Sequence, residues 1–342
     1  APVKTAIIVL NYNGLALMQE FMAPLLRCSP QADIVVADNG STDHSLQWLR
    51  QHYPEVQIIA LEENLGYAGG YNKAISLLRQ PSKSQNNPRH DLYVLLNNDI
   101  KVVQGWLDPI IQAFEQEKEL VAAQPKIKDL NKTQYFEYAG AAGGYLDTFG
   151  YPFCRGRVLN VLEQDHGQYD DNQEIFWASG ACLCLRAEAF ERVGGFDSDL
   201  FAHQEEIDLC WRLQSIGGRV RCLTQSSVYH KGGGTLSSAH PRKSFLNFRN
   251  SLLVLIKNVA GPRIVFIILV RLILDGLSGI VFILQGRPKH TWAIIKAHFS
   301  VYRLLPIYLK KRKIWANRLK YARISSILYA RFFKNRRYFS QL

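Results

Sequence analysis

The sequence predicts an α/β protein with a mostly parallel central sheet flanked by helices, and two observations support this fold class. Short apolar runs rich in β-branched residues recur at intervals of about 20 to 30 residues, and segments with helical spacing separate them. Each run ends in Asn, Asp or Gly, as strands do where they lead into turns. Strands that alternate with helices form parallel sheets covered on both faces, and ligands bind beyond the carboxyl ends of such strands.

The elements follow one another through the first hundred residues. The expected strands are 5–10, 34–37, 56–61 and 92–96. Helices are expected over 15–26, where apolar residues recur at helical spacing, and over a segment that ends near Gln51. The polar residues 80–90 predict a surface loop, whereas 140–170 are rich in Gly and Tyr and show no period.

The charge of the chain is divided unevenly, although its total is +12. Residues 1–245 carry 22 basic and 28 acidic side chains, whereas 246–342 carry 19 basic side chains and one acid, Asp275. The second part is also rich in Ile, Leu, Val, Phe and Trp, which a segment that binds only phosphate does not need. We therefore expect an α/β domain over 1–245 and a basic, apolar, helical membrane-docking region over 246–342, with an anionic membrane surface and no nucleic acid as its partner.

The cysteines and the N-terminal pattern indicate a cytosolic setting. The six cysteines include no CxxC pair and have no zinc-site spacing, so we interpret them as reduced thiols that pack in the interior. The sequence begins directly in a strand pattern, so no signal peptide is expected.

Two polar loops after the early strands suggest a nucleotide site. In the segment 38–43 (DNGSTD), the Asp38 carboxylate can accept hydrogen bonds from a nucleobase or ribose, or the loop can simply turn and cap a helix. The segment 63–72 (ENLGYAGGYN) places small residues at a helix start, where a pyrophosphate can approach backbone N–H groups and the positive end of the helix dipole. It lacks GxGxxG, which counts against a dinucleotide-binding dehydrogenase.

Acidic residues and one histidine suggest further chemistry. Asp99 follows the strand 92–96 and offers oxygen ligands to Mg²⁺ or Mn²⁺ bridging a diphosphate. Glu205, Glu206 and Asp208 begin an amphipathic helix, where they repel one another unless a sugar, a metal or another cation uses them; a solvated helix N-terminus is the alternative. His230, beside a Gly run, can complete a metal site, bind phosphate or be structural.

Taken together and in this order, the motifs resemble the GT-A glycosyltransferases of family 2, especially the bacterial rhamnosyltransferase-like branch that builds surface polysaccharides. The runs that carry the resemblance are IIVLNYNG, VVADNGSTD, ENLGYAGGYN, VLLNNDI, ASGACLCLRAEAFERVGGFD, EEIDLCWR and VYHKGGGT. They cover about residues 4–240. The resemblance therefore implies a GT-A fold and a glycosyltransferase catalytic domain over 1–245.

The resemblance also implies roles for particular residues. Glu206 stands at the position of the catalytic base, which is normally Asp, and Glu205 beside it is the alternative. Asp99 matches the last position of the DxD metal motif, whose first position is Asn97 here, and His230 matches a metal-ligating His. The residues expected on the nucleotide and phosphate side are Asn11, Asn13, Asp38, Asn39, Ser41, Asn64, Gly66, Tyr67, Asn72, Asn97 and Asn98. The residues expected near donor sugar and acceptor are Trp177, Ser179, Gly180 and Asp208.

The implied activity is an inverting transfer from a nucleoside diphosphate sugar, with Mg²⁺ or Mn²⁺ as cofactor. The resemblance favours dTDP-rhamnose or a UDP-sugar as donor. The expected acceptor is a hydroxyl of a lipid-linked saccharide, because a membrane-docked enzyme meets such substrates in the plane of the membrane.

The expected docking segment is Ile264–Gln285, whose 22 residues would span about 33 Å as a helix. Arg271 and Asp275 interrupt it, and a single crossing would place 15 Lys and Arg of 286–342 outside, against the positive-inside rule. We therefore expect helices that lie in the inner leaflet, at the cytoplasmic face, as a peripheral or monotopic anchor. The alternative is a soluble helical subdomain whose apolar stripe packs on the catalytic core.

Two other functions compete with glycosyl transfer. A sugar nucleotidyltransferase shares a nucleotide-binding sheet, but residues 11–20 (NYNGLALMQE) contain no Lys or Arg for the basic Gly-rich signature that it needs. A non-catalytic, membrane-bound nucleotide-sugar binding protein would not need Glu206. Turnover therefore separates it from a transferase.

Overall fold

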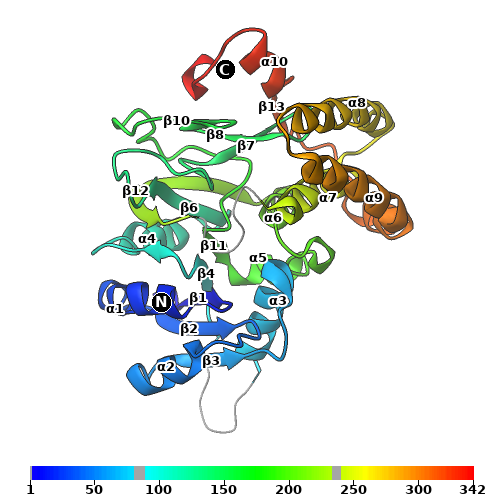
Figure 1. Cartoon of the computed structure of the whole chain (residues 1–342). Coiled ribbons are helices and arrows are strands. Elements are labelled where there is room, and N and C mark those ends of the chain that lie inside the picture. Colours follow the sequence, from blue (N-terminus) through cyan, green and yellow to red (C-terminus); the bar gives the residue numbers. More distant parts are fainter. Residues whose placement is uncertain (1, 81–88, 233–239) are drawn as a thin grey trace.

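Figure 1 shows the computed structural model of the protein, and residues 2–80, 89–232 and 240–342 are described below. The strands are β1 Thr5–Asn11, β2 Asp33–Asp38, β3 Gln57–Ala60, β4 Leu92–Asn97, β5 Ile100–Lys101, β6 Leu120–Asp129, β7 Gly144–Asp147, β8 Pro152–Cys154, β9 Arg157–Val158, β10 Val161–Leu162, β11 Cys182–Arg186, β12 Arg219–His230 and β13 Ala322–Ile324. The α-helices are α1 Leu15–Cys28, α2 Ser45–His52, α3 Gly66–Leu78, α4 Asp108–Gln116, α5 Ala187–Arg192, α6 Glu205–Ser215, α7 Pro241–Asn258, α8 Arg263–Leu284, α9 Pro288–Trp315 and α10 Ile327–Phe332. Two short 3₁₀ helices are η1 Ser198–Leu200 and η2 Phe339–Gln341.

The main sheet has eight strands in the order β3-β2-β1-β4-β11-β6-β12-β5. The first four strands are parallel, as predicted, and β6 is parallel to β12. Strand β11 runs antiparallel between β4 and β6, which the sequence did not indicate. The predicted α/β class with a mostly parallel sheet is therefore confirmed. The polar loop predicted over 80–90 lies largely outside the described residues.

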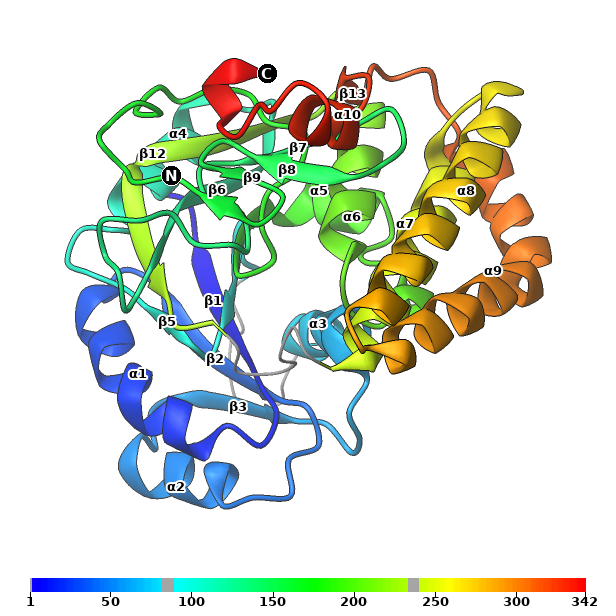
Figure 2. The ribbon, with the colours of Figure 1, turned by 45° about the horizontal axis from the view of Figure 1, so that its top comes forward.

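The helices cover both faces of this sheet because alternate strand residues point to opposite sides. Ile7 and Val9 of β1 share a core with α1, whereas Ala6 and Ile8 share the other core with α3. Figure 2 shows α1 and α3 on opposite sides of β1 and β2. The loops at the carboxyl ends of the strands lie between these layers, where ligands of such sheets bind. All six cysteines are free and buried.

A smaller sheet explains the stretch 140–170, in which we found no period. Its order is β10-β9-β8-β7-β13, and β13 comes from the far C-terminal part of the chain. The Phe339 ring lies 5.4 Å from Tyr145 and 6.2 Å from Phe153, between ring centroids. Strands of two to four residues are too short to show a period, and one of their partners is remote in sequence.

Three long helices, α7, α8 and α9, stand beside the main sheet, on the side away from α1 and α2 (Figures 1 and 2). Helix α7 packs against α6 and α9, and the expected domain limit at residue 245 falls within it. Helix α8 buries Ile267, Arg271, Asp275 and Gly279, which share one face. Its other faces expose large apolar side chains. Among the described residues only α8 is long and apolar enough to cross a membrane, which by itself is weak evidence for membrane association.

Candidate active site

The loop after β2 is held by a dense network of hydrogen bonds around Asp38. The amide of Asn11 donates to Asp38 Oδ1 at 3.0 Å, and the Ser41 hydroxyl donates to the same oxygen at 2.6 Å. The backbone N–H of Ser41 donates to Asp38 Oδ2 at 2.9 Å. Asn13 has φ 49° and accepts from the N–H of Thr42 at 2.7 Å. The ends of β1 and β2 are thereby joined into one rigid edge, which contains four of the predicted nucleotide residues.

A second set of amides joins this edge to the start of α3. Asn39 donates to the carbonyl of Gly66 at 3.0 Å and to Asn64 Oδ1 at 3.1 Å. Asn64 in turn accepts from the N–H of Gly66 at 2.9 Å. Gly66 has φ 72°, and a Cβ there would come within 2.7 Å of the Phe201 side chain, so this position requires glycine. The structure therefore brings the first two predicted loops together. Asn98 also joins them, because its amide donates to Asn11 at 3.0 Å.

The helix α3 links the nucleotide loops to more distant segments. The hydroxyl of Tyr67 donates to the carbonyl of Gly180 at 2.7 Å. Asn72 bonds through its amide to Phe196 and Ser198, at 2.9 to 3.0 Å, so its amide is engaged within the protein. Asn72 therefore holds the turn at residues 196–198 against α3.

Sheet topology brings Asp99 and His230 together from distant parts of the sequence. Asp99 lies between β4 and β5, and β5 pairs with the end of β12, where His230 faces Ile100. The two side chains meet with His230 Nε2 3.1 Å from Asp99 Oδ1. On its other side, His230 Nδ1 lies 2.9 Å from Glu137 Oε2. Glu137 was not among the predicted residues, because only the return of β12 places His230 beside it.

The electrostatics of this cluster place a positive charge between two acids. His230 is buried, which alone would lower its pKa, but the contacts with Asp99 and Glu137 outweigh burial and raise the pKa of His230 to about 10. Asp99 Oδ1 and His230 Nδ1 are buried without a well-aligned hydrogen bond. Without a metal ion, the imidazolium supplies the positive charge that the two acids require, whereas an ion bound by His230 would replace its proton.

The donor atoms of the cluster fit a divalent cation. Carboxylate oxygens suit Mg²⁺ and Mn²⁺, and an imidazole nitrogen suits transition metals, so the pair Asp99 and His230 favours Mn²⁺ of the two. Within the described residues, no three His, Cys, Asp or Glu side chains are arranged to hold an ion by themselves. The remaining ligands would have to come from a substrate, as expected for a site that binds a diphosphate.

The acidic helix α6 begins with a strained backbone. Phe201, His203 and Gln204 have φ values of 65°, 69° and 72°, in the left-handed region that non-glycine residues rarely adopt. Such strain costs free energy and concentrates at functional sites. Here it turns the chain so that Glu205 and Glu206 lie side by side at the start of the helix.

The two glutamates differ in burial and in proton affinity. Glu205 is buried, and burial together with the charge of Glu206 raises its pKa well above the ordinary value. Glu206 is only partly buried, and desolvation raises its pKa to about 7, against the opposing backbone N–H groups of the helix start. Burial therefore favours the protonated form of Glu205, while Glu206 titrates near neutral pH.

Hydrogen bonds connect Tyr67 of α3 to the Asp99 cluster. Burial raises the pKa of Tyr67 well above its usual value, and the charges of Tyr71, Glu205 and Glu206 raise it further, so Tyr67 lies within electrostatic range of the two glutamates. Tyr67 bonds to Gly180, and the neighbouring hydroxyl of Ser179 bonds to the carbonyl of Ala139. The N–H of Ala139 donates to Glu137, the partner of His230, at 2.6 Å.

Two residues expected near donor sugar and acceptor have buried side chains. Trp177 is buried beneath Gly144, and its indole N–H donates to the carbonyl of Tyr145 at 3.0 Å. Asp208 is fully buried and faces α7, where it pairs with Lys257 at 2.9 Å. Helical spacing explains this placement, because Asp208 is two residues beyond Glu206 and therefore points to another side of the helix.

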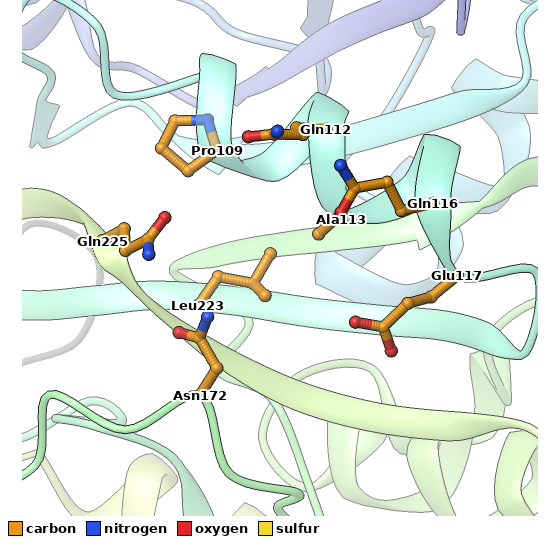
Figure 3. A pocket seen from close by; sticks show the side chains of 8 residues that line it. All are labelled: Pro109, Gln112, Ala113, Gln116, Glu117, Asn172, Leu223 and Gln225. Atoms are coloured by element: carbon orange, nitrogen blue, oxygen red, sulfur yellow. The ribbon is translucent and has the colours of Figure 1, made fainter.

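A hollow on another part of the molecule is unrelated to these residues. It measures about 240 Å³ and lies between α4 and β12 (Figure 3). Its lining consists of Pro109, Gln112, Ala113, Gln116, Glu117, Asn172, Leu223 and Gln225. None of these is a predicted site residue, and we assign it no function.

Comparison with known families and relatives agrees with this geometry. Residues 6–194 match glycosyl transferase family 2, and residues 144–305 match glycosyl transferase family group 2. An N-acetylglucosaminyl-diphospho-decaprenol L-rhamnosyltransferase of Mycobacterium tuberculosis is 27% identical over 229 residues, which are 66% of this chain and 75% of the relative. The rhamnosyltransferase WbbL of Escherichia coli is 26% identical over 234 residues, which are 68% of this chain and 83% of the relative.

Solved structures share the fold. GalNAc-T7 with UDP, GalNAc and Mn²⁺ superposes with a TM-score of 0.56 at 16% identity, over 75% of this chain and 48% of that chain. Residues 1–349 of Staphylococcus aureus TarS in complex with UDP-GlcNAc superpose with a TM-score of 0.55 at 14% identity, over 90% of this chain and 83% of that chain. At such identities the likeness extends to the GT-A fold alone.

Proposed function

The chain belongs to glycosyl transferase family 2, and from that premise we propose that it is an inverting enzyme that transfers a sugar from a nucleoside diphosphate sugar to a lipid-linked saccharide. Its relatives include rhamnosyltransferases, one of which is named for N-acetylglucosaminyl-diphospho-decaprenol. The observation that carries the proposal is the meeting of Asp99 and Glu137 around His230, a cluster that hydrogen bonds connect to Tyr67 of α3.

The donor that we propose is dTDP-rhamnose or a UDP-sugar. The names of the relatives favour rhamnose, and a structural neighbour binds UDP-GlcNAc. The edge built around Asp38 would hold the base and ribose, because its carboxylate and amides offer several hydrogen-bonding groups at the carboxyl ends of β1 and β2. The start of α3 would act on the diphosphate through the positive end of its helix dipole, because the N–H groups of Leu65, Gly66 and Ala68 already donate within the protein.

The proposed chemistry is a single displacement. Glu206 takes the proton from the acceptor hydroxyl as its oxygen attacks the anomeric carbon, and the bond from that carbon to the diphosphate breaks. The nucleoside diphosphate leaves with the electron pair of that bond. Glu205, which keeps its proton, reduces repulsion beside Glu206. A divalent cation held by Asp99 and His230 would neutralise charge on the departing diphosphate.

Metal binding can be tested without turnover. In the wild-type protein, Mn²⁺ together with UDP or dTDP is expected to raise the unfolding temperature, because a ligand at 100 times its Kd stabilises the folded state by about 2.7 kcal/mol. Asp99→Asn is expected to remain folded but to lose the increase in unfolding temperature that depends on Mn²⁺. Asp108→Asn removes an exposed carboxylate at the start of α4 and serves as the control. An unchanged Mn²⁺ effect in Asp99→Asn would mean that the ion binds elsewhere.

We also propose that α8 docks on the cytoplasmic face of the membrane. Its polar residues face the protein: Arg271 pairs with Asp275 at 3.1 Å and donates to the carbonyl of Phe149 at 2.9 Å. The two charges that interrupt the apolar segment therefore face the protein and would not contact lipid. The apolar side chains that face outward are Val265, Phe266, Leu269, Leu272, Ile273, Leu277, Ile280, Val281, Ile283 and Leu284. A surface helix of a soluble protein points its apolar side chains inward. In α8 the charged side chains face inward and the apolar ones face outward, which favours a lipid environment.

Vesicle flotation tests this docking. Replacing Leu269, Ile273 and Leu277 together with Asn is expected to reduce binding to anionic vesicles by about 100-fold or more, since each such side chain contributes about 1.5 to 3 kcal/mol when buried. These residues form one outward stripe, and their removal exposes no core. Val103→Asn, at an exposed apolar position of the catalytic half, is the control. Equal flotation of the triple variant and the wild type would refute docking through α8.

A further inference from the structure

A groove lies between the first turns of α7 and α9, away from the residues assigned above. Its volume is about 720 Å³, within the range of small-molecule sites. Its apolar surface comes from Phe245, Trp292 and Ala293, and from the stems of its basic side chains. Three basic residues surround it, namely Arg242, Lys289 and Lys296.

The charge of this groove is uncompensated. Arg242, Lys289 and Lys296 are exposed, and none of them forms an ion pair in the described part of the chain. No acid lines the groove, and the one acid of 246–342, Asp275, is buried in its pair with Arg271. Three cations around an apolar floor suit a ligand that combines a multiply charged anion with a hydrocarbon chain.

One end of the groove adjoins the loop that leads to the proposed base. The guanidinium of Arg242 lies 5.0 Å from the Phe201 ring centroid. Further along the same helix, Asn250 donates to the carbonyls of Ala202 and His203 at 2.9 and 2.7 Å. Helix α7 is therefore fixed to the strained turn that begins α6, where Glu206 lies.

The other end of the groove opens toward the proposed membrane face. Trp292 is 56% exposed, and Ile295 and Phe299 continue an exposed apolar surface along α9. Helix α9 packs against α8, whose outward side chains form the docking surface described above. A ligand in the groove can thus have its charged group near the catalytic loop and its hydrocarbon in the lipid.

We propose that this groove binds the diphosphate and the first isoprenoid units of the acceptor's lipid carrier. The inference rests on the proposed function, in which the acceptor is lipid-linked. The Arg242 guanidinium can bind phosphate oxygens through two parallel N–H groups, while Lys289 and Lys296 add point charges. Phe245 and Trp292 contact the isoprenoid chain. The groove thereby places the acceptor saccharide toward Glu206 while the carrier remains in the membrane.

Direct binding tests the groove independently of turnover. The probe is farnesyl diphosphate, measured by calorimetry on the full chain, with farnesol and inorganic diphosphate as partial ligands. The groove variant combines Arg242→Gln, Lys289→Gln and Lys296→Gln. It is expected to bind farnesyl diphosphate at least about tenfold more weakly than the wild type. Trp292→Ser is expected to weaken farnesyl diphosphate and farnesol but not inorganic diphosphate.

The matched control removes an equal number of positive charges from a part of α9 outside the groove. Arg303→Gln, Lys310→Gln and Lys313→Gln combined also replace one exposed Arg and two exposed Lys, outside the groove. Binding to phosphatidylglycerol vesicles should fall equally in both triple variants, whereas farnesyl diphosphate binding should fall only in the groove variant. If farnesyl diphosphate binding falls equally in both triple variants, or falls in neither, the proposal is overturned in favour of a general attraction to anionic lipid.

Turnover separates this inference from the function on which it rests. With a polyprenyl diphosphate saccharide as acceptor, the groove variant is expected to raise the acceptor KM at least about tenfold and to leave the donor KM unchanged. If the wild type transfers no sugar while farnesyl diphosphate binding still depends on the groove, the proposed function fails and the groove remains. If turnover is normal and the acceptor KM is the same in both triple variants, the groove fails and the function remains.

Discussion

Glu206→Gln is expected to lower kcat by about 10²- to 10⁴-fold, the usual contribution of a positioned general base. Gln has the size and shape of a protonated Glu, so the helix start should keep its structure. The side chain forms no ion pair among the described residues, so its neutralisation leaves no unpaired partner behind. Steady-state kinetics should show a lower kcat with little change in the donor KM, and the unfolding temperature should remain near that of the wild type.

The pH dependence identifies the group that titrates. Desolvation raises the pKa of Glu206 to about 7, so in the wild type kcat should rise tenfold per pH unit below 7 and level off above it. The sign follows from the requirement for the deprotonated form, whose fraction grows as the pH increases. The residual activity of Glu206→Gln should lack this step.

Glu205→Gln is the matched control for this variant. Burial and the charge of Glu206 keep the pKa of Glu205 well above its usual value, which favours the protonated form that Gln resembles. We expect activity to be largely kept. If Glu205→Gln were instead inactive and Glu206→Gln active, the roles of the two residues would be exchanged.

Much of the fold could be predicted because local patterns determine it. The strand Thr5–Asn11 is buried on both faces and reads as a continuous apolar run, which the sequence displays directly. The antiparallel insertion of β11 and the pairing of β13 with β7 could not be predicted, since both depend on contacts between remote segments. The same holds for the polarity of α8, whose apolar composition does not reveal which face is covered.

The candidate site shows a similar division. The loops around Asp38 and Gly66 are local, and the structure brings them together as the strand pattern predicted. Glu137 escaped prediction because its role depends on β12 returning to place His230 beside it. Asp208 stands in the same motif as Glu206, yet the turn of the helix directs it into the interior toward Lys257.

The partner of Asp208 gives the largest expected effect on stability. Lys257 of α7 is 3% exposed and pairs with Asp197 at 2.8 Å and with Asp208 at 2.9 Å. Lys257→Met keeps the aliphatic volume but removes the cation that the two carboxylates share, and leaves Asp208 with Arg212 and Asp197 with Lys311. Breaking a buried pair costs about 3 to 5 kcal/mol of unfolding free energy when the remaining charge is unpaired, so the remaining cations hold the expected loss to at most about 3 kcal/mol. Urea unfolding at neutral pH measures it, and Lys310→Met, at an exposed site on α9, is the control.

The loss should depend on pH in a direction that packing alone would not produce. In the wild type, burial opposes ionisation of Asp208 and Asp197, but Lys257 and the other partners outweigh it and lower both pKa values, so their contribution is present above about pH 4 and is lost below it. In Lys257→Met the carboxylates ionise at a cost, which protonation relieves as the pH falls. The difference in unfolding free energy between variant and wild type should therefore shrink from neutral pH toward pH 4. A difference that stays constant would indicate lost packing instead.

This variant also tests whether the C-terminal helices position the proposed base. Asp208 lies on α6 two residues after Glu206, and Asn258 of α7 donates to Asp208 Oδ1 at 2.9 Å, so α7 holds the catalytic helix through charge and hydrogen bonds. At a temperature where Lys257→Met remains folded, we expect a lower kcat. The donor KM should change little, because the proposed nucleotide loops follow β1 and β2 and do not contact Lys257. A variant that is less stable but fully active would show that the network stabilises the fold without positioning Glu206.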